Sequence, residues 1–188
     1  MQIFAYDPDQ FGLGEVISAW SPDHNYLAVC GESRVVKIFD RQGNNKIEMP
    51  LKSTAKVLDL DWDMDSESLA ILQRNYTIVV WTPGTKSVTE IDMPSPKDLA
   101  SFIKWSAVEP ILTIGTEKGS LVFFNKKNQR KIPCVGKHSK KVNTGDWNDE
   151  SLLITGAEDK ILTLSNGTGD TVIDSFIVKG KPHGLMWA

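Results

Sequence analysis

Hydrophobic residues fall in short β-rich segments along the whole chain, and polar, turn-forming residues separate these segments. Helix periodicity is almost absent. The stretches Ser21-Pro22-Asp23, Thr82-Pro83-Gly84 and Asn166-Gly167 mark chain reversals, because their residue types favour tight turns. The pattern predicts four successive groups of four strands, at residues 16–21, 26–31, 35–40 and 45–51; 57–63, 68–73, 77–82 and 87–93; 100–106, 111–117, 120–126 and 130–136; 142–148, 152–158, 160–166 and 171–178.

Tryptophan recurs at a nearly constant interval through these groups. The intervals are 42, 43, 42 and 40 residues, between Trp20, Trp62, Trp105, Trp147 and Trp187. An apolar strand core follows seven residues after each of the first three tryptophans and six residues after the fourth. Nineteen residues after the first three comes Phe39, Trp81 or Phe124, and Ser165 takes that place one residue early in the fourth repeat. A period of about 40–45 residues is that of a WD-type propeller blade, whose four-stranded sheet must stack on neighbours.

The repeats predict an all-β WD40-type propeller over residues 1–188. We place its blades at about 15–51, 57–93, 99–136 and 142–178. Residues 183–188 resemble the first strand of a fifth blade, and residues 2–7 resemble a strand that closes the last blade of a ring. Four blades and one strand would leave open sheet faces and an unpaired edge. We therefore expect a partial propeller, the front of a larger ring, with a closed four-bladed ring as the alternative.

Composition is that of an ordinary globular protein, with 40% hydrophobic and 24% charged residues. The formal net charge of −3 argues against a general nucleic-acid binder. No apolar run approaches the roughly 20 residues of a membrane helix, and the first residues do not resemble a signal peptide. We expect no membrane insertion and an intracellular protein, in which Cys30 and Cys134 are reduced thiols.

Candidate catalytic and metal sites fail on spacing. Counted from Asp59 or Asp61, the acidic run 59–65 lacks the glycine and glutamate of a calcium-binding EF-hand loop. Its alternation with apolar residues is typical of a strand. The three histidines, His24, His138 and His183, have no metal-ligand spacing, and the chain has no G-x-S-x-G motif. We expect no enzyme, no metal, no cofactor and no small-molecule substrate.

His138 has a structural interpretation. WD blades often contain a buried network of a histidine, a Ser or Thr, an aspartate and a tryptophan. The fourth repeat offers His138, Thr155 and Asp159, with Ser165 in place of the tryptophan. Such a network ties loop to strand through charge-assisted hydrogen bonds. We therefore expect these residues, like the periodic tryptophans, to be structural repeat positions.

One surface feature is a basic run without acidic residues between residues 126 and 141. It is a candidate patch for an acidic protein, anionic lipid or RNA partner. The alternative is an outer strand whose lysines discourage edge-to-edge aggregation. No aromatic residues alternate with these charges, which argues against binding of single-stranded nucleic acid. The run consists of Lys126, Lys127, Arg130, Lys131, Lys137, Lys140 and Lys141.

Several stretches resemble a particular family. They are VKIFDR at 36–41, RKIP at 130–133, GKH at 136–138, EDK at 158–160 and GDT at 169–171. Over residues 14–178 the chain resembles the N-terminal propeller of the WD repeat-containing protein 19 family, subunits of intraflagellar transport complex A. The resemblance implies a non-catalytic scaffold for retrograde ciliary transport and cilium assembly.

The resemblance also implies where the protein acts and with what. Its partners would be other complex A subunits and ciliary cargo or adaptor proteins, at the cilium, the ciliary base and in the cytoplasm. The alternative is a WD-repeat scaffold of another assembly. Such an assembly could be a vesicle coat, a ubiquitin-ligase substrate receptor or an RNA-processing particle that uses residues 126–141.

Overall fold

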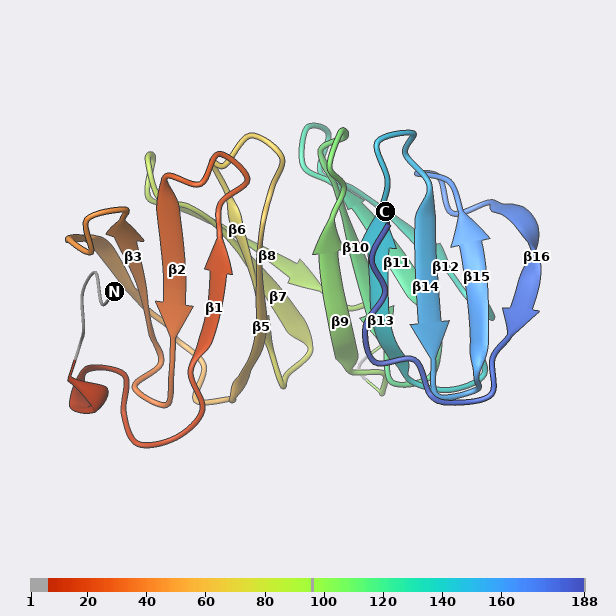
Figure 1. The fold of residues 1–188 in the computed structure, drawn as a ribbon, viewed down its shortest axis with the longest axis horizontal. Helices are drawn as coiled ribbons and strands as arrows, with labels where there is room; N and C mark the ends of the chain where they lie inside the picture. Colours follow the sequence, from red (N-terminus) through yellow and green to blue (C-terminus); the bar gives the residue numbers. More distant parts are fainter. Residues whose placement is uncertain (1–6, 96, 188) are drawn as a thin grey trace. The chain divides into compact units, whose positions relative to one another are not determined.

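The computed structural model describes residues 7–95 and 97–187, which form four four-stranded antiparallel sheets (Figure 1). A single 3-10 turn, η1 (Pro8–Gln10), precedes the strands, and no α-helix occurs among the described residues. This confirms the predicted all-β class. By its contacts the chain divides into two compact units, Met1–Ile91 and Asp92–Ala188, and each contains two sheets.

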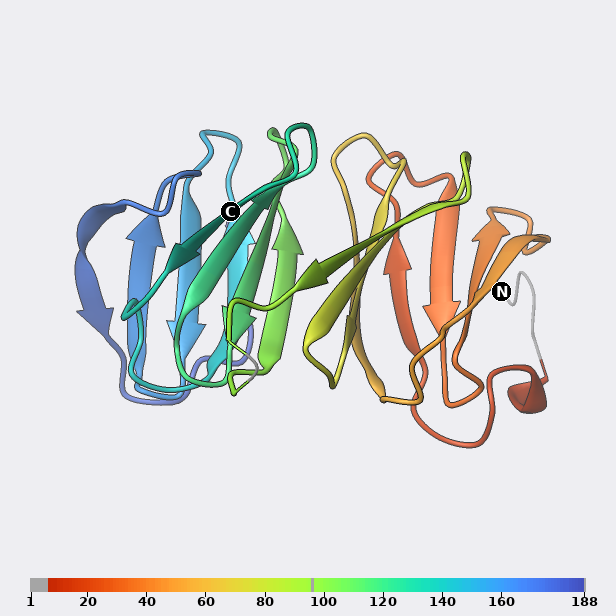
Figure 2. The ribbon, with the colours of Figure 1, turned by 180° about the vertical axis from the view of Figure 1, so that it is seen from behind.

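In each sheet the strands pair in chain order. The N-terminal unit contains β1 (Ile17–Trp20), β2 (Tyr26–Cys30), β3 (Val35–Asp40) and β4 (Asn45–Pro50), then β5 (Val57–Trp62), β6 (Leu69–Gln73), β7 (Thr77–Thr82) and β8 (Ser87–Asp92). The C-terminal unit contains β9 (Ala100–Trp105), β10 (Ile111–Thr116), β11 (Leu121–Asn125) and β12 (Arg130–Cys134), then β13 (Val142–Trp147), β14 (Leu153–Ala157), β15 (Ile161–Ser165) and β16 (Thr171–Ile177). Figure 2 shows the outer strands from behind.

The observed strands lie inside the predicted ranges and end one or two residues earlier in several places. Ser21, Asp63 and Ser106 mark such ends, directly after β1, β5 and β9. Each uses its side chain to bond backbone groups of the following turn. A residue engaged in a turn in this way leaves the ladder, so the sequence pattern overestimates strand length by that residue.

Each unit has its own apolar core between its two sheets. In the N-terminal unit the core includes Ala28 and Ile38 of the first sheet and Leu60, Trp62 and Ile71 of the second. Strand β6 is buried along its whole length, whereas β4 alternates between exposed and half-buried residues. Central strands covered on both faces need continuous apolar residues, and outer strands need only one apolar face.

The core of the C-terminal unit is arranged in the same way. It joins Phe102, Leu121 and Phe123 of one sheet to Val142 and Trp147 of the next. The Phe123 and Trp147 rings meet edge to face, with centroids 6.2 Å apart and an interplanar angle of 80°. Both units thus bury equivalent repeat positions.

The two cysteines are free thiols, Cys30 buried and Cys134 half-buried. Burial raises the pKa of the Cys30 thiol to about 11 and also raises that of Cys134. Both therefore remain protonated at neutral pH, which agrees with the expectation of reduced thiols.

The segment after β16 returns along β13 (Figure 1). The backbone N–H groups of Leu185 and Trp187 donate to the side chains of Thr144 and Asp146. Residues 183–187 form no ladder with β13. Most of the closing strand expected at residues 2–7 lies outside the described residues.

Candidate protein-interaction surfaces

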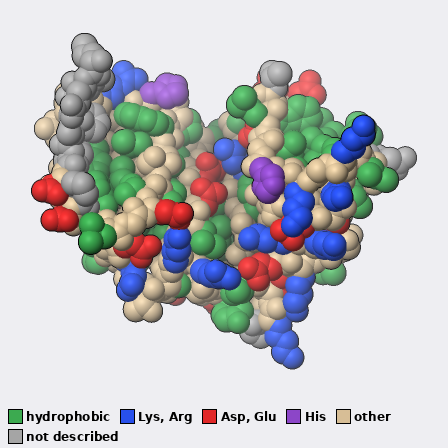
Figure 3. Space-filling view, turned by 60° about the horizontal axis from the view of Figure 1, so that its bottom comes forward, with side chains coloured by type: hydrophobic (Ala, Val, Ile, Leu, Met, Phe, Trp, Pro, Cys, Tyr) green, Lys and Arg blue, Asp and Glu red, His purple; other side chains and the backbone are tan. Residues whose placement is uncertain are grey.

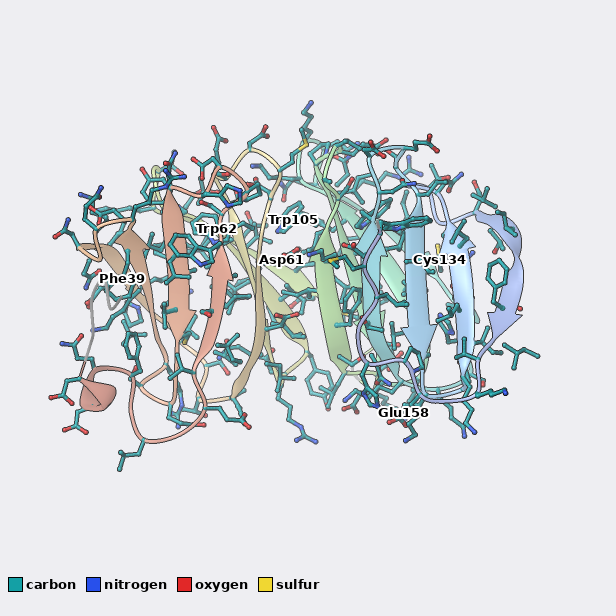
Figure 4. All side chains as sticks on the ribbon, in the orientation of Figure 1. Phe39, Asp61, Trp62, Trp105, Cys134 and Glu158 are labelled. Atoms are coloured by element: carbon teal, nitrogen blue, oxygen red, sulfur yellow. The ribbon has the colours of Figure 1, made fainter. Side chains whose placement is uncertain are left out.

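Two of the recurring tryptophans bond to the preceding repeat. The Trp62 indole N–H donates to the backbone oxygen of Ala19 over 3.1 Å, and the Trp187 indole N–H donates to that of Asp146 over 3.0 Å. Each acceptor directly precedes the tryptophan of the previous repeat. Figure 4 shows Trp62 and Trp105 among the side chains of the sheets. At Trp62 and Trp187 the indole therefore bonds to the preceding repeat in addition to packing against it.

Exposure of these tryptophans follows their place in the chain. Trp62, Trp105 and Trp147 are at most 5% exposed, whereas Trp20 is 49% exposed. The Trp147 indole nitrogen is buried without a hydrogen-bond partner in the described structure, so this residue contributes through its ring contact with Phe123. Trp62, Trp105 and Trp147 therefore contribute buried apolar area, and Trp62 also contributes an indole hydrogen bond.

The residue after each of the first four tryptophans caps the next turn. Asp63 Oδ1 accepts the N–H groups of residues 67 and 68, and Ser106 Oγ accepts those of residues 108 and 109. Asn148 Oδ1 accepts those of residues 150 and 152, and Ser21 Oγ accepts that of Tyr26. This role was not predicted, although a short polar residue directly after each tryptophan was its signal.

The short polar residues at the ends of the third strands act similarly. Asp40, Asn125 and Asn166 each accept two backbone N–H groups of the following turn. The pKa of Asp40 falls to about 2, chiefly because Asn44 donates to its carboxylate. Together with the caps after the tryptophans, these bonds hold the loops at one end of each sheet in defined conformations.

The structure brings the predicted His138 network together. His138 Nε2 lies 3.0 Å from Thr155 Oγ1, and its Nδ1 lies 3.4 Å from Asp159 Oδ2. Thr163, which was not predicted to take part, completes the cluster: its Oγ1 lies 2.8 Å from Thr155 Oγ1 and 3.3 Å from His138 Nε2. Ser165 is also buried, but its hydroxyl has no hydrogen-bond partner in the described structure. Threonine, not Ser165, therefore contacts the histidine.

Electrostatics fits a structural role for this cluster. Burial lowers the pKa of His138 below its ordinary value and outweighs the opposing attraction of Asp159. The pKa of Asp159 is also lowered; burial opposes this shift, and N–H donation from Ser139 and Ile161 causes it, with help from His138. The imidazole is therefore neutral at pH 7. In this form its Nε2 makes one hydrogen bond with Thr155, and its Nδ1 faces the Asp159 carboxylate.

The structure divides the basic run among different places. Lys126 and Lys127 lie in the β11–β12 turn at one end of β12, whereas Lys140 and Lys141 follow β12 at the other end. A strand of five residues separates the two ends by roughly 17 Å. Lys137 Nζ donates to Thr171 Oγ1 over 2.6 Å, and therefore extends along β16. The seven residues do not form one continuous patch.

Within β12, adjacent residues have different surroundings. Arg130 lines a groove with Ile132 and Phe123, whereas Lys131 Nζ donates to the backbone oxygen of Asp92 over 3.3 Å. Alternation along a strand sends successive side chains to opposite faces. Arg130 and Lys131 are therefore adjacent in sequence, but their side chains lie on opposite faces of β12.

That groove has a counterpart in the N-terminal unit. The groove beside Arg130, of about 410 Å³, lies where Ile111, Phe123 and Ile132 meet the turns 150–152 and 166–168. A groove of about 430 Å³ lies at the equivalent repeat positions, beside Tyr26, Ile38 and Ile47. Both have an apolar floor and a polar rim. Such a site can receive an apolar side chain of another protein.

The acidic run 59–65 does not form a metal site. Successive residues Asp61 and Trp62 (Figure 4) lie half-exposed and buried on β5, as strand alternation predicts. Asp63 caps a turn, and Asp59 Oδ1 accepts the N–H of Leu60. Across the described residues, no group of three or more His, Cys, Asp or Glu is placed to hold a metal ion. Nor does any described helix have the length and apolar character needed to cross a membrane.

A profile described as WDR19 first beta-propeller matches residues 16–188. The chain belongs to this family. It is 42% identical to human WD repeat-containing protein 19 over 164 residues and 39% identical to the mouse protein over 172 residues, which are 87% and 90% of this chain. WD repeat-containing protein dyf-2 of Caenorhabditis elegans is 29% identical over 180 residues, 94% of this chain. These alignments span only 12–13% of the length of the relatives.

Solved structures confirm the fold. The structure of U3-55K superposes with a TM-score of 0.76 over 89% of this chain and 53% of that one, at 14% identity. The WD40 repeats of RRP9 give a TM-score of 0.76 over 89% of this chain and 52% of theirs, also at 14% identity. The TM-scores support the WD40 propeller fold, and at identities this low the likeness carries no functional argument.

Proposed function

We propose that this chain is a non-catalytic scaffold that binds other proteins, as part of the first propeller of an intraflagellar transport complex A subunit. Its partners would be other complex A subunits and ciliary cargo or adaptors, in retrograde transport and cilium assembly. It would act at the cilium, the ciliary base and in the cytoplasm. The observation that carries the proposal is the match of residues 16–188 to the WDR19 first beta-propeller family.

The proposed domain is a partial WD40 propeller with blades at 15–51, 57–93, 99–136 and 142–178. Repeated caps after Trp62, Trp105 and Trp147 support a scaffold role, because they hold loops at defined places for a partner. The grooves of both units provide apolar floors beside those loops. Large apolar anchors seated in such pockets usually dominate the binding energy of an interface.

Affinity purification of the tagged chain from ciliated cells, followed by mass spectrometry, tests this function. We expect recovery of complex A subunits above the level obtained with an unrelated WD40 propeller that carries the same tag. Recovery of coat, ubiquitin-ligase or RNA-processing components without complex A subunits would instead favour one of the alternative assemblies. Recovery of chaperones alone would contradict the proposal that this chain makes contacts within the complex by itself.

The structure gives the RNA-processing alternative no additional support. It rested on the run 126–141 acting as one basic surface, and β12 separates Lys127 from Lys140 at opposite ends of a sheet. A filter-binding titration of the chain with RNA across salt concentrations tests it directly. A steep fall in affinity with salt would indicate several phosphate contacts.

A further inference from the structure

Four loops of the C-terminal unit meet at one end of its two sheets, opposite the turns that follow the tryptophans. They are residues 117–120, 135–141, 158–160 and 178–182. In antiparallel sheets every second connection returns to the same end, so segments far apart in the sequence are gathered there. Figure 3, which brings the lower end of the sheets forward, shows Lys and Arg side chains collected on this part of the molecule, with Asp and Glu side chains among them.

We define the lysine face by six residues of these loops. Five of the six have no carboxylate within ion-pair distance in the described part of the chain, and only Lys181 has one, at 3.2 Å from Glu158. Asp159 already accepts backbone N–H groups of Ser139 and Ile161. The lysine face consists of Lys118, Lys140, Lys141, Lys160, Lys179 and Lys181.

Backbone hydrogen bonds connect the four loops to one another. His138 N donates to Gly119 O over 2.9 Å, and Glu158 N donates to Lys141 O over 2.9 Å. Val178 N donates to Lys160 O over 2.8 Å. The loops therefore present their lysines from a connected backbone. A partner that binds here loses little free energy to ordering the loops.

Like charges at this end repel one another, and a Debye length of about 8 Å at physiological ionic strength screens this repulsion only in part. An anionic partner would relieve that repulsion and would be attracted from a distance. The four lower loops together contain seven lysines and three acidic residues, Glu117, Glu158 and Asp159. The upper turns of the same unit differ, because they carry Glu109, Asp149, Glu150 and Asp170 beside Lys126 and Lys127. Positive charge is thus concentrated at one end of this unit.

The chemistry of the lysine face favours carboxylates on a polypeptide over phosphates. Its loops contain no arginine, the residue that binds phosphate through two parallel hydrogen bonds. They contain no Phe, Tyr or Trp on which a base could stack. Val135 and Ile177, at the lower ends of the two outer strands, are 85% and 86% exposed. A peptide that mixes acidic and apolar residues can use both kinds of group, and a phosphate backbone can use only the charge.

We propose that the lysine face is a docking surface for an acidic polypeptide segment of a partner protein. This inference rests on the proposed scaffold function and specifies the chemistry of one partner. The segment would place glutamates or aspartates against the lysines and apolar residues against Val135 or Ile177. Complementary charge of this kind speeds association and selects the partner.

The test is fluorescence anisotropy of the full chain with a labelled peptide that alternates glutamate with leucine and valine. The same peptide with glutamine in place of glutamate is the control ligand. The variant K140E/K160E reverses two charges of the lysine face. The variant K86E/K127E is its matched control, because it makes the same change of charge at exposed sites elsewhere. Each pair also contains one turn residue of positive φ, Lys160 at 67° and Lys86 at 57°.

We expect salt-sensitive binding of the acidic peptide, about tenfold weaker for K140E/K160E and near the original value for K86E/K127E. Equal losses in the two variants, or no preference for the acidic over the glutamine peptide, would overturn the inference. So would tighter binding of phosphatidylserine vesicles or of RNA with the same dependence on Lys140 and Lys160. Equal thermal midpoints of the two variants would exclude unfolding as the cause of weaker binding.

The two proposals fail in different ways. If the tagged chain recovers complex A subunits but does not bind the acidic peptide, only the assignment of the lysine face is refuted. If the peptide binds through Lys140 and Lys160 and complex A subunits are not recovered, the lysine face stands and the proposed transport function fails.

Discussion

The substitution Trp62→Phe tests whether the periodic tryptophan bonds one blade to the previous one. The indole N–H of Trp62 donates to Ala19 O over 3.1 Å, and the ring is 5% exposed. Phenylalanine keeps an aromatic ring at this position and removes the donor. The change therefore isolates the hydrogen bond and a small part of the packing.

The magnitude follows from two contributions. Loss of the hydrogen bond costs about 1 kcal/mol, since water can reach the half-buried Ala19 and recover part of its solvation. The smaller ring leaves a cavity of about 40 Å³, which at roughly 24 cal/mol per Å³ costs about 1 kcal/mol more. The free energy of unfolding should therefore fall by about 2 kcal/mol. With a slope of about 2 kcal/mol per molar urea, the midpoint should fall by about 1 M.

Urea unfolding followed by circular dichroism measures this change, and Trp20→Phe is the matched control. Trp20 occupies the same repeat position, is 49% exposed, and its indole N–H makes no hydrogen bond in the described structure. Its substitution should change stability by less than about 0.5 kcal/mol. Equal midpoint shifts in the two variants would refute the argument that the buried indole bond of Trp62 stabilises the contact between the first two repeats.

Three further changes test the network, the loops and the caps. His138 has a lowered pKa, so the unfolded chain binds its proton first as pH falls. The stability that follows from this shift is fully present above the unfolded pKa of about 6.5 and is lost as pH falls from there through the folded pKa. Urea midpoints of His138→Gln should therefore depend less on pH over this window than those of the original chain. An equal pH dependence of the two would contradict the assignment to His138. Gly119→Ala should lower the thermal midpoint strongly, because φ at this residue is +89° and an added Cβ would lie 2.3 Å from His138 O. Gly84→Ala is the control, because a Cβ added there meets nothing within 4 Å and should leave the midpoint unchanged. Similar midpoints of the two variants would refute the close approach of Gly119 to His138 O. Asn148→Ala removes the acceptor of two backbone N–H groups and should cost about 1 kcal/mol in urea unfolding, and no loss would show that the turn does not need its cap.

Local chemistry carried most of the fold prediction. Apolar alternation and turn residues are properties of neighbouring residues. Together with the interval between Trp20, Trp62, Trp105 and Trp147, which can be counted along the sequence, they located the four sheets. The same holds for the contact of His138 with Thr155 and Asp159, because the sequence order of a blade places them at one end of its sheet. Strand ends were less accurate, since Ser21, Asp63 and Ser106 serve the turns with side chains that resemble strand residues in sequence.

Tertiary structure decided the surfaces. By itself the sequence determined the repeats, their strands and the run of basic residues from 126 to 141. Only the folded sheets separate Lys127 from Lys140 and bring Lys118, Lys160 and Lys179 toward Lys140. The physical reason is that consecutive antiparallel strands send alternate loops to opposite ends of a sheet. Neighbours in sequence therefore become distant in space, and residues some twenty positions apart share one surface.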